Sequence, residues 1–524
     1  MPPTTNGTEE GAHAPWWAYR SALLLLVLAS AIPMIWPAVP PLTDLPGHMG
    51  RYRVELDGAT SPYLGGFFAF HWALLANLGV DLLVLPLGRL LGLEPAVKLI
   101  VMAIPPLTAA GYIWTAREAH GRVPPTALFA LPFAYGYPLM FGFVNFALSM
   151  ALALFALGLW LRLGRNRRHR LRAALFVPIA LLLWVAHIYG WVLLGLAAAA
   201  TELVAQRRAA GSGIGGWARA FARTAVQLLS LAAPLVPTLL WRGGAAGGSF
   251  DWFHWSRKAD WAIMPLRDLW PVWDIGSVAL AAAVIVGILL ATVVGRRRRG
   301  TWAGGLEPGL GLTALLLAVA FVLAPGTVFG SAYADMRLVP FAFGFALIAI
   351  RPDAWGRYSG AAALAGLAFF AARTAGTTAS FALHDRAWSA QLDALHHLPR
   401  GARLVTFVAR GCPPAWGTPR FDHLPSMAIV RREAFANDQW TMAGAQLLSV
   451  RYEGGAFVRD PSQFVVRDRC VSPFPTLDKA LAKLPRAGFD YVWLIDPPPY
   501  DPRSLRGLRP VWRRGQSALF RVER

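Results

Sequence analysis

Charged residues are scarce in this sequence. They make up 15% of the 524 residues, whereas 56% are hydrophobic. Soluble domains carry about 25% charged residues, so this composition excludes an ordinary soluble multidomain protein and indicates a membrane protein. No ATP-binding motif is present, and the region after His384 has neither a Gly-rich phosphate loop nor a nucleophile elbow. That region therefore offers little sign of chemistry of its own.

Cysteine is also rare. The chain has two, Cys412 and Cys470, both in the part that follows the last apolar run. Neither has a ligand-type spacing with histidine, which argues against a structural zinc site. If this part lies in the periplasm, the compartment permits a disulfide between the two residues. Two separate free thiols fit the sequence equally well.

Long apolar runs, by contrast, recur from Tyr19 to about Ser380. A helix needs about 20 mainly apolar residues to cross a bilayer, and several of these runs are shorter. The pattern predicts a mainly α polytopic membrane bundle of about 11–13 segments. The expected segments are 21–37, 72–91, 97–114, 126–140, 142–163, 171–186, 189–205, 221–240, 275–294, 306–323, 338–350 and 360–380.

The basic residues mark one side of the membrane. A formal net charge of +21 would suit a nucleic-acid partner, but many of the arginines form short blocks between apolar runs, at 165–172, 207–208 and 296–299. Such blocks are typical of cytoplasmic loops that meet anionic lipid headgroups. We therefore expect membrane lipids, and no nucleic acid, as partners.

One stretch of the bundle does not fit a simple pair of spans. If every segment crossed the membrane and the N-terminus were cytoplasmic, the arginine block at 165–172 would lie outside, against the positive-inside rule. The stretch from Thr126 to Leu163 is interrupted by prolines and glycines, among them Pro138 and Gly142. A broken helix or re-entrant pair beside a polar chamber is expected there.

The composition changes near residue 380. The predicted organisation is a cytoplasmic tail over 1–18, a transmembrane domain over 19–380 with a first outer loop at 38–70, and a periplasmic α/β domain over 381–524. The expected location is a bacterial inner membrane. Within the last domain we expect strands at 403–409, 427–430, 491–495 and 518–522 and a helix near 477–484.

The first outer loop concentrates ionisable residues directly after the first span. Asp44 lies there, and a short helix is expected to begin near Pro46. His48 and Arg51 share one face of that helix with Glu55. Asp44 can deprotonate a hydroxyl or hold a metal ion, or it can simply cap the helix. His48 and Arg51 can bind phosphate or sugar, or Arg51 can pair with Glu55.

Two further acids and their neighbours stand out against apolar sequence. Asp81 falls inside the run at 72–91, one helical turn after Asn77, where a carboxylate is costly unless it is paired or wet. It predicts either a chamber wall or a structural hydrogen bond between helices. Asp335 and Arg337 lie at the outer boundary of a later run, where Arg337 is a candidate phosphate clamp oriented by Asp335; the alternative is an interfacial ion pair of little energetic worth.

A histidine separates two short apolar runs. His187, followed by Tyr189, should lie at the outer turn of a hairpin if both flanking arginine blocks are cytoplasmic. It would then lie on the same side of the membrane as Asp44. Substrate contact and a purely structural role both fit this placement.

The order of these features resembles the GT-C superfamily of polyprenyl-phosphate-sugar glycosyltransferases. The loop Asp44-Leu45-Pro46-Gly47-His48 with Arg51 looks like the acidic Pro-His loop of bacterial GT-C-like proteins. The segment from Tyr137 to Phe146, with Asn145, looks like their aromatic Gly-Phe-Asn segment. The architectural likeness covers nearly the whole chain, although the matching motifs are short.

The resemblance implies a sugar transferase. Asp44 would be the base, Arg337 resembles the late basic residue of GT-C enzymes, and transfer would invert the sugar's anomeric configuration. The donor would be a polyprenyl-phosphate-linked sugar and the acceptor a glycan, lipid or protein of the cell envelope. Many relatives carry two nearby acids, whereas the next acids here are Glu55 and Asp57. No cofactor is therefore certain, and a divalent metal is left open.

Two other functions fit the same sequence. The broken stretch and Asp81 can form the path of a lipid or glycolipid transporter or flippase, although the soluble domain and the absence of a hydropathy repeat speak against it. A non-catalytic GT-C-like protein of envelope assembly is the third interpretation, because a fold does not fix an activity.

Overall fold

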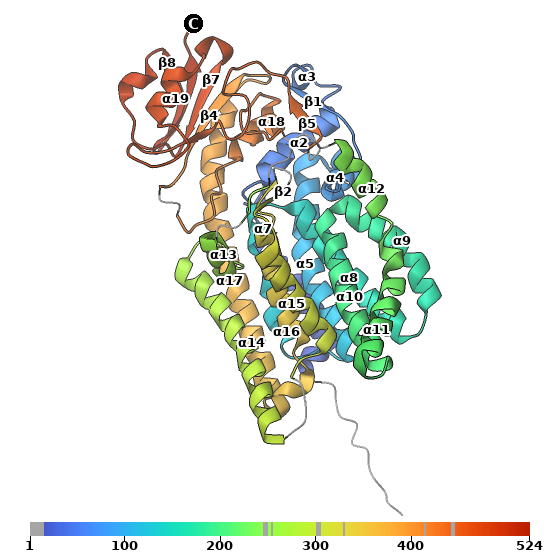
Figure 1. Ribbon diagram of the computed structural model, residues 1–524. Coiled ribbons are helices and arrows are strands. Elements are labelled where there is room, and N and C mark those ends of the chain that lie inside the picture. Colours follow the sequence, from blue (N-terminus) through green and yellow to red (C-terminus); the bar gives the residue numbers. More distant parts are fainter. Residues whose placement is uncertain are drawn as a thin grey trace, which may run out of the picture.

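The protein has two parts, a helical bundle and a smaller α/β domain stacked on one end of it (Figure 1). The computed structural model describes residues 15–244, 250–252, 255–299, 305–328, 331–412, 415–441 and 446–524. The predicted fold class, a mainly α membrane bundle followed by an α/β domain, is confirmed.

Five helices in the described part are long and apolar enough to cross a bilayer. They are α5 (Leu93–His120), α8 (Val144–Arg165), α9 (His169–Ala186), α10 (Ile188–Ala209) and the stretch Pro271–Val294 of α14 (Pro271–Arg299). Shorter apolar helical stretches cover Arg20–Met34, Ala127–Phe141, Pro308–Leu323 and Met336–Ala349. The chain is thus a multi-pass membrane protein. The side chains of the arginine block at 296–299 lie outside the described residues.

Two expected spans are wrong. The run at 72–91 forms only α4 (Gly79–Leu91), whose 13 residues cover about 20 Å. The preceding residues bond to other loops instead, for example Leu78 N to the Val185 carbonyl. The run at 221–240 is split between α11 (Gly213–Leu228) and α12 (Leu235–Gly244), because Pro234 cannot continue the hydrogen-bonding pattern of a helix.

The broken stretch is confirmed. It consists of α6 (Ala127–Ala130), the 3₁₀ helix η3 (Leu131–Tyr135), α7 (Tyr137–Phe141) and the start of α8. Gly142 ends α7 in the left-handed region, with φ at 102°. A residue with a Cβ would be strained in this conformation. The interruption lies just beneath the first outer loop.

The first outer loop packs on the α/β domain. After α1 (Arg20–Ala29) and η2 (Ile32–Met34), it forms α2 (Leu45–Asp57), α3 (Leu64–Phe67) and β1 (Phe68–Phe70). Strand β1 pairs with β5 (Leu448–Val450), and the side chains of Val54 and Phe68 join the apolar core of the domain. The helix expected from Pro46 is therefore confirmed, and it lies between the two parts of the protein.

The α/β domain is built on a five-stranded sheet of order β6-β4-β7-β9-β8. Strand β4 is parallel to β6 and β7, and β9 is antiparallel to β7 and β8. The strands are β4 (Leu404–Ala409), β6 (Phe464–Val465), β7 (Tyr491–Ile495), β8 (Leu508–Arg514) and β9 (Ser517–Val522), and the main helix is α19 (Leu477–Lys483). The strand expected at 427–430 is wrong. It is the helix α18 (Met427–Arg432), because a short buried apolar run has no period that separates helix from strand.

A long helix connects the two parts. Helix α17 (Ser359–Leu392) rises from the bundle to the domain in Figure 1, so the expected boundary at residue 380 falls within one continuous helix. The other α helices and strands are α13 (Trp255–Ile263), α15 (Pro308–Leu323), α16 (Val339–Ala349), β2 (Thr327–Val328) and β3 (Ser331–Ala332). The remaining 3₁₀ helices are η1 (Trp16–Ala18), η4 (Leu229–Leu231), η5 (Met336–Leu338), η6 (Pro352–Tyr358), η7 (Asp393–His397), η8 (Leu424–Ser426), η9 (Arg486–Gly488) and η10 (Pro502–Leu505).

Candidate active site

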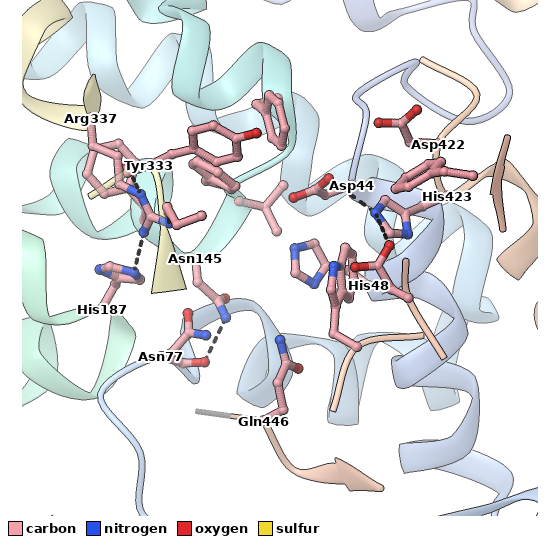
Figure 2. A pocket seen from close by; sticks show the side chains of 18 of the residues that line it. Asp44, His48, Asn77, Asn145, His187, Tyr333, Arg337, Asp422, His423 and Gln446 are labelled. Carbon is pink, nitrogen blue, oxygen red and sulfur yellow. Dashed lines mark hydrogen bonds and ion pairs between the residues drawn. The ribbon is translucent and has the colours of Figure 1, made fainter. Parts of the chain in front are cut away.

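A cavity of about 330 Å³ lies where the bundle meets the α/β domain. Asp44, His187 and Arg337 all line it, although they come from three distant parts of the chain. Figure 2 shows Arg337 and His187 at one end, Asp422 and His423 at the other, and Asp44 on the side of the latter pair. The cavity therefore unites the residues that the sequence placed on one side of the membrane.

The broken stretch holds Asp44 in place. The backbone N–H of Asp44 donates to the Phe141 carbonyl at 2.9 Å, and Phe141 directly precedes the turn at Gly142. A Cβ on Gly142 would lie 2.7 Å from the Asp44 nitrogen. Only glycine lets the two chains approach this closely. The interruption of the apolar pattern thus seats the Asp44 loop.

The carboxylate of Asp44 is not a helix cap. Asp44 is the residue before α2, and its carbonyl accepts from His48 N, but its side chain makes no capping hydrogen bond. The residue is 7% exposed and lines the cavity. Burial, and then the negative charges of Asp422 and Asp460, raise the pKa of this carboxyl well above its usual range. The capping interpretation is therefore wrong.

Arg337 and His187 form an end of the cavity that offers hydrogen-bond donors. The Tyr189 N–H donates to His187 Nδ1 at 3.2 Å, so the neutral ring carries its proton on Nε2. That Nε2 lies 3.4 Å from Nη1 of Arg337. A guanidinium nitrogen also donates hydrogen bonds and cannot accept them. Two donors this close to one another repel, and an anion that accepts from both would relieve the repulsion. Arg337 is 7% exposed, and its other hydrogen bonds go to the carbonyls of Tyr333 and Ala332.

The opposite end offers hydrogen-bond acceptors. His423 Nδ1 lies 3.0 Å from the Asp438 carbonyl, which accepts only, so Nδ1 carries the proton and Nε2 a lone pair. Nε2 lies 3.8 Å from Asp44 Oδ1 and 3.9 Å from Asp460 Oδ1. Burial lowers the pKa of His423 to about 4, which keeps the ring neutral near pH 7. His187 and His423, at the two ends of the cavity, thus have opposite tautomers.

A buried hydrogen-bonded network lies beside the cavity, and two of its members, Asn77 and Asn145, also line it. Arg51 forms an ion pair of 2.8 Å with Asp81, and both are buried. Asn145 donates to Asp81 at 3.0 Å and to the Asn77 carbonyl at 2.8 Å. Asp81 is the third residue of α4 and so lies at a helix N-terminus, not deep in a span. These contacts favour the prediction that Asp81 forms a structural hydrogen bond between helices. Arg51 pairs with Asp81 and not with Glu55.

Three other candidates lie beside the cavity without lining it. Asp335 accepts from Lys258 and from Met336 N, each at 2.8 Å, so it does not orient Arg337 as expected. Tyr189 donates its hydroxyl proton to the Ala334 carbonyl at 2.7 Å. Tyr137 stacks on Trp261, with Arg267 over its ring. These two aromatic residues support the walls around the site.

The sequence analysis did not predict that the α/β domain contributes to the site. Seven of its described residues line the cavity, namely Arg410, Asp422, His423, Trp440, Gln446, Asp460 and Phe464. A signal was nevertheless present, because Arg410 directly follows β4, and the carboxyl ends of parallel strands are where α/β domains bind ligands. Among the described residues, no three His, Cys, Asp or Glu side chains are placed to hold a metal ion.

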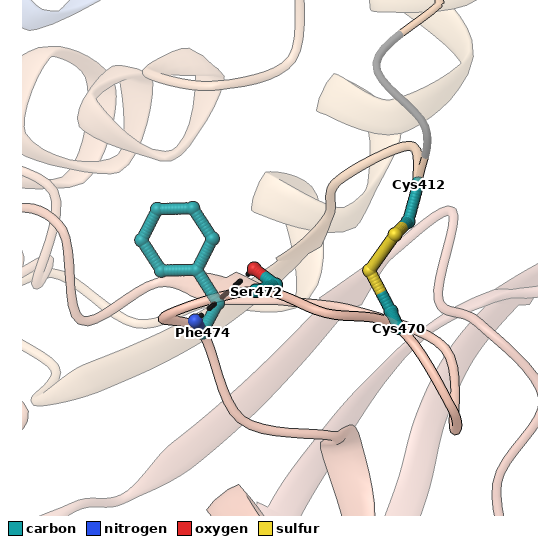
Figure 3. Close-up of a disulfide and its surroundings, with 4 residues drawn as sticks. All are labelled: Cys412, Cys470, Ser472 and Phe474. Atoms are coloured by element: carbon teal, nitrogen blue, oxygen red, sulfur yellow. Dashed lines mark hydrogen bonds between the residues drawn. A yellow bond between two sulfur atoms is a disulfide. The ribbon is translucent and has the colours of Figure 1, made fainter.

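A disulfide anchors the segment that carries Arg410. Cys412 is bonded to Cys470, so the two-thiol alternative is wrong (Figure 3). The bond joins the segment after β4 to the loop after β6. Arg410 N also donates to the Val465 carbonyl, and its guanidinium lies 2.7 Å from Asp422. The position of Arg410 is therefore fixed by backbone, disulfide and ion pair together.

The pH dependence of the site follows from these charges. If Asp44 acts as a base, it must be ionised, and activity should then fall as the pH drops through its raised pKa. Replacing Asp460 with asparagine removes a neighbouring negative charge and lowers the pKa of Asp44. The acidic limb of the kcat/KM profile should then move to lower pH, whereas Glu523→Gln, an exposed carboxylate outside the cavity, should leave it in place. An unmoved limb in Asp460→Asn would show that Asp44 does not set the profile.

No protein-family model matches the chain, and no curated protein matches it. Two solved structures are similar. ArnT from Cupriavidus metallidurans in the apo state is 14% identical, with a TM-score of 0.48 over 96% of each chain. The same protein bound to undecaprenyl phosphate is 13% identical, with a TM-score of 0.47 over 96% of this chain and 97% of the other.

Proposed function

We propose that this protein is a membrane glycosyltransferase that moves a sugar from a polyprenyl-phosphate donor to an envelope acceptor, with Asp44 as the base. The observation that carries the proposal is the convergence of Asp44, His187 and Arg337 on one cavity. The cavity has a donor-rich end suited to phosphate and a buried carboxylate free of helix capping. These are the two requirements of the reaction.

The proposed reaction uses both ends. Arg337 and His187 hold the phosphate of the donor lipid by charge-assisted hydrogen bonds. Asp44 takes the proton of the acceptor hydroxyl as its oxygen bonds to the anomeric carbon, and the bond from that carbon to the phosphate oxygen breaks. The phosphate leaves with the bonding electron pair, stabilised by Arg337. Inversion follows from a single displacement of this kind.

We place the reaction on the periplasmic side of a bacterial inner membrane. The disulfide between Cys412 and Cys470 supports an oxidising compartment for the α/β domain. The arginine block after α8, at the opposite end of the bundle, supports a cytoplasmic position for that end. The proposed organisation keeps the tail at 1–18 in the cytoplasm and the domain over 381–524 outside.

Removing the cation from the donor-rich end should weaken donor binding. A charge-assisted hydrogen bond contributes about 1.5–3 kcal/mol, so Arg337→Met should raise the KM for a polyprenyl-phosphate sugar about 10- to 100-fold. Arg337→Lys should fall in between, since it keeps the charge and loses the planar fork. The exposed Arg386→Met serves as control. Unchanged donor KM in Arg337→Met would remove this residue from phosphate binding.

The function itself is tested with the purified protein in liposomes that contain a radiolabelled polyprenyl-phosphate sugar. A membrane extract outside serves as acceptor. Covalent transfer of the label to the extract supports the transferase. Movement of the labelled lipid between leaflets without a product would support the flippase instead, and neither movement nor product would support a non-catalytic assembly protein.

A further inference from the structure

The α/β domain supplies one half of the cavity wall. Arg410 and Phe464 lie at or near the carboxyl ends of the parallel strands β4 and β6, and both line the cavity. Asp422, His423 and Asp460 come from the chain between these two strands, and Figure 2 shows the first two beside Asp44. The domain thus turns its usual ligand-binding edge towards Asp44.

Next to Asp44, this half presents hydrogen-bond acceptors from His423 and Asp460. His423 Nε2 carries a lone pair, because Nδ1 donates to the Asp438 carbonyl. The residue is 5% exposed, and no hydrogen-bond donor is recorded for Nε2 among the described residues. Asp44 and Asp460 flank His423 Nε2 with carboxylate oxygens. When these groups are ionised, their oxygens accept hydrogen bonds and donate none. A buried lone pair of this kind requires a donor from a ligand.

The one cation that the described residues of this half present to the cavity is already compensated. The guanidinium of Arg410 lies 2.7 Å from Asp422 and stacks over Phe464 at 4.1 Å. Asp44 and Asp460 remain as uncompensated carboxylates beside His423. An anionic group entering this half would meet like charge, whereas the Arg337 end would attract it.

An aromatic side chain completes the subsite. Trp440 lies against His423, with ring centroids 4.1 Å apart, and against His48 at 5.3 Å. It lines the cavity and so offers an apolar surface next to the row of acceptors. A flat apolar surface bordered by hydrogen-bond acceptors suits a sugar ring, whose hydroxyls donate at its edge.

We propose that the α/β domain forms the subsite for the acceptor and selects a carbohydrate that donates hydrogen bonds, neutral or amine-bearing, against one that carries a phosphate near the attacking hydroxyl. The inference rests on the proposed transferase activity. The acceptor's proton goes to Asp44, its oxygen forms the new glycosidic bond, and the lipid phosphate leaves at the Arg337 end. Asp460 and His423 act as positioning residues that sort acceptors.

Three matched acceptors test the selection in the full-length protein: octyl glucoside, its 6-amino-6-deoxy derivative and its 6-phosphate. The neutral and amino acceptors should be used, and kcat/KM for the phosphate should be lower by about tenfold or more. Asp460→Asn should narrow this gap by lowering KM for the phosphate, when both proteins are assayed at a pH above the acidic limb of each profile. Glu453→Gln, an exposed carboxylate of the same domain, should leave the gap as it is.

The two proposals fail differently. Transfer to the phosphate as fast as to the neutral acceptor, or a gap unchanged in a folded Asp460→Asn protein, would overturn the acceptor subsite. Transfer to a membrane extract but to none of the three glycosides would overturn it as well. If even the extract receives no sugar, the transferase proposal itself fails.

Discussion

Asp44→Asn is expected to lower the rate of sugar transfer by about a thousandfold, within the range measured for the loss of a general base. Asparagine has nearly the same shape, and the backbone bond from Asp44 N to the Phe141 carbonyl does not involve the side chain. The loop, α2 and the donor-rich end should therefore stay in place. Only the ability to take a proton from the acceptor is lost.

The measurement is kcat with a polyprenyl-phosphate sugar at saturating donor and acceptor. Binding of undecaprenyl phosphate and the thermal midpoint should match the parent. Asp57→Asn is the matched control, since it removes a carboxylate from the same outer loop, where Asp57 pairs with Arg53 outside the cavity. A folded Asp44→Asn protein with parental kcat would exclude Asp44 as the base.

Removing one partner of the buried ion pair between Arg51 and Asp81 should have the largest effect on stability. Asp81→Ala is expected to cost about 3–5 kcal/mol, because the guanidinium stays buried without its counter-charge. Asp81 also accepts from Asn145, which links α4 to the start of α8. The variant should therefore unfold at a much lower SDS fraction in mixed micelles.

A double variant separates the pair from its surroundings. Arg51→Met with Asp81→Leu replaces both charges by apolar groups and should recover most of the lost stability. The exposed pair of Arg514 and Asp393 gives the contrast, since Asp393→Ala should cost under about 1 kcal/mol. Equal stability of Asp81→Ala and the parent would mean that water or a movement of Arg51 compensates the missing charge.

Local patterns predicted the parts of the site that depend on local sequence. The position of Asp44 after the first span, the break around Gly142 and the turn at His187 each follow from residues close to one another in the chain. Arg337 was placed by its distance from a membrane boundary. The expected pairing of Arg337 with Asp335 was wrong, because Asp335 pairs with Lys258 of a different helix. Which of two cations an acid pairs with depends on packing between segments far apart in sequence.

The contribution of the α/β domain to the cavity could not be predicted from local sequence patterns, because it also depends on contacts between distant segments. His423 acquires its role from the carbonyl of Asp438 and from the approach of Asp44, hundreds of residues earlier. Asp81 was misplaced within its helix because apolar residues before Gly79 suggested a longer span, whereas their backbone bonds go to neighbouring loops. Composition indicates which residues enter a membrane. The residue at which a helix begins depends on the segments that contact that end of the helix.

The pairing of β1 with β5 joins residues near 70 to residues near 450. During synthesis, the early helices enter the bilayer long before the ribosome reaches the second of these strands. A nascent chain at that stage holds Asp44 without His423 or Arg410. The cavity that these three residues line is therefore complete only after the α/β domain has been synthesised and has packed against the first outer loop.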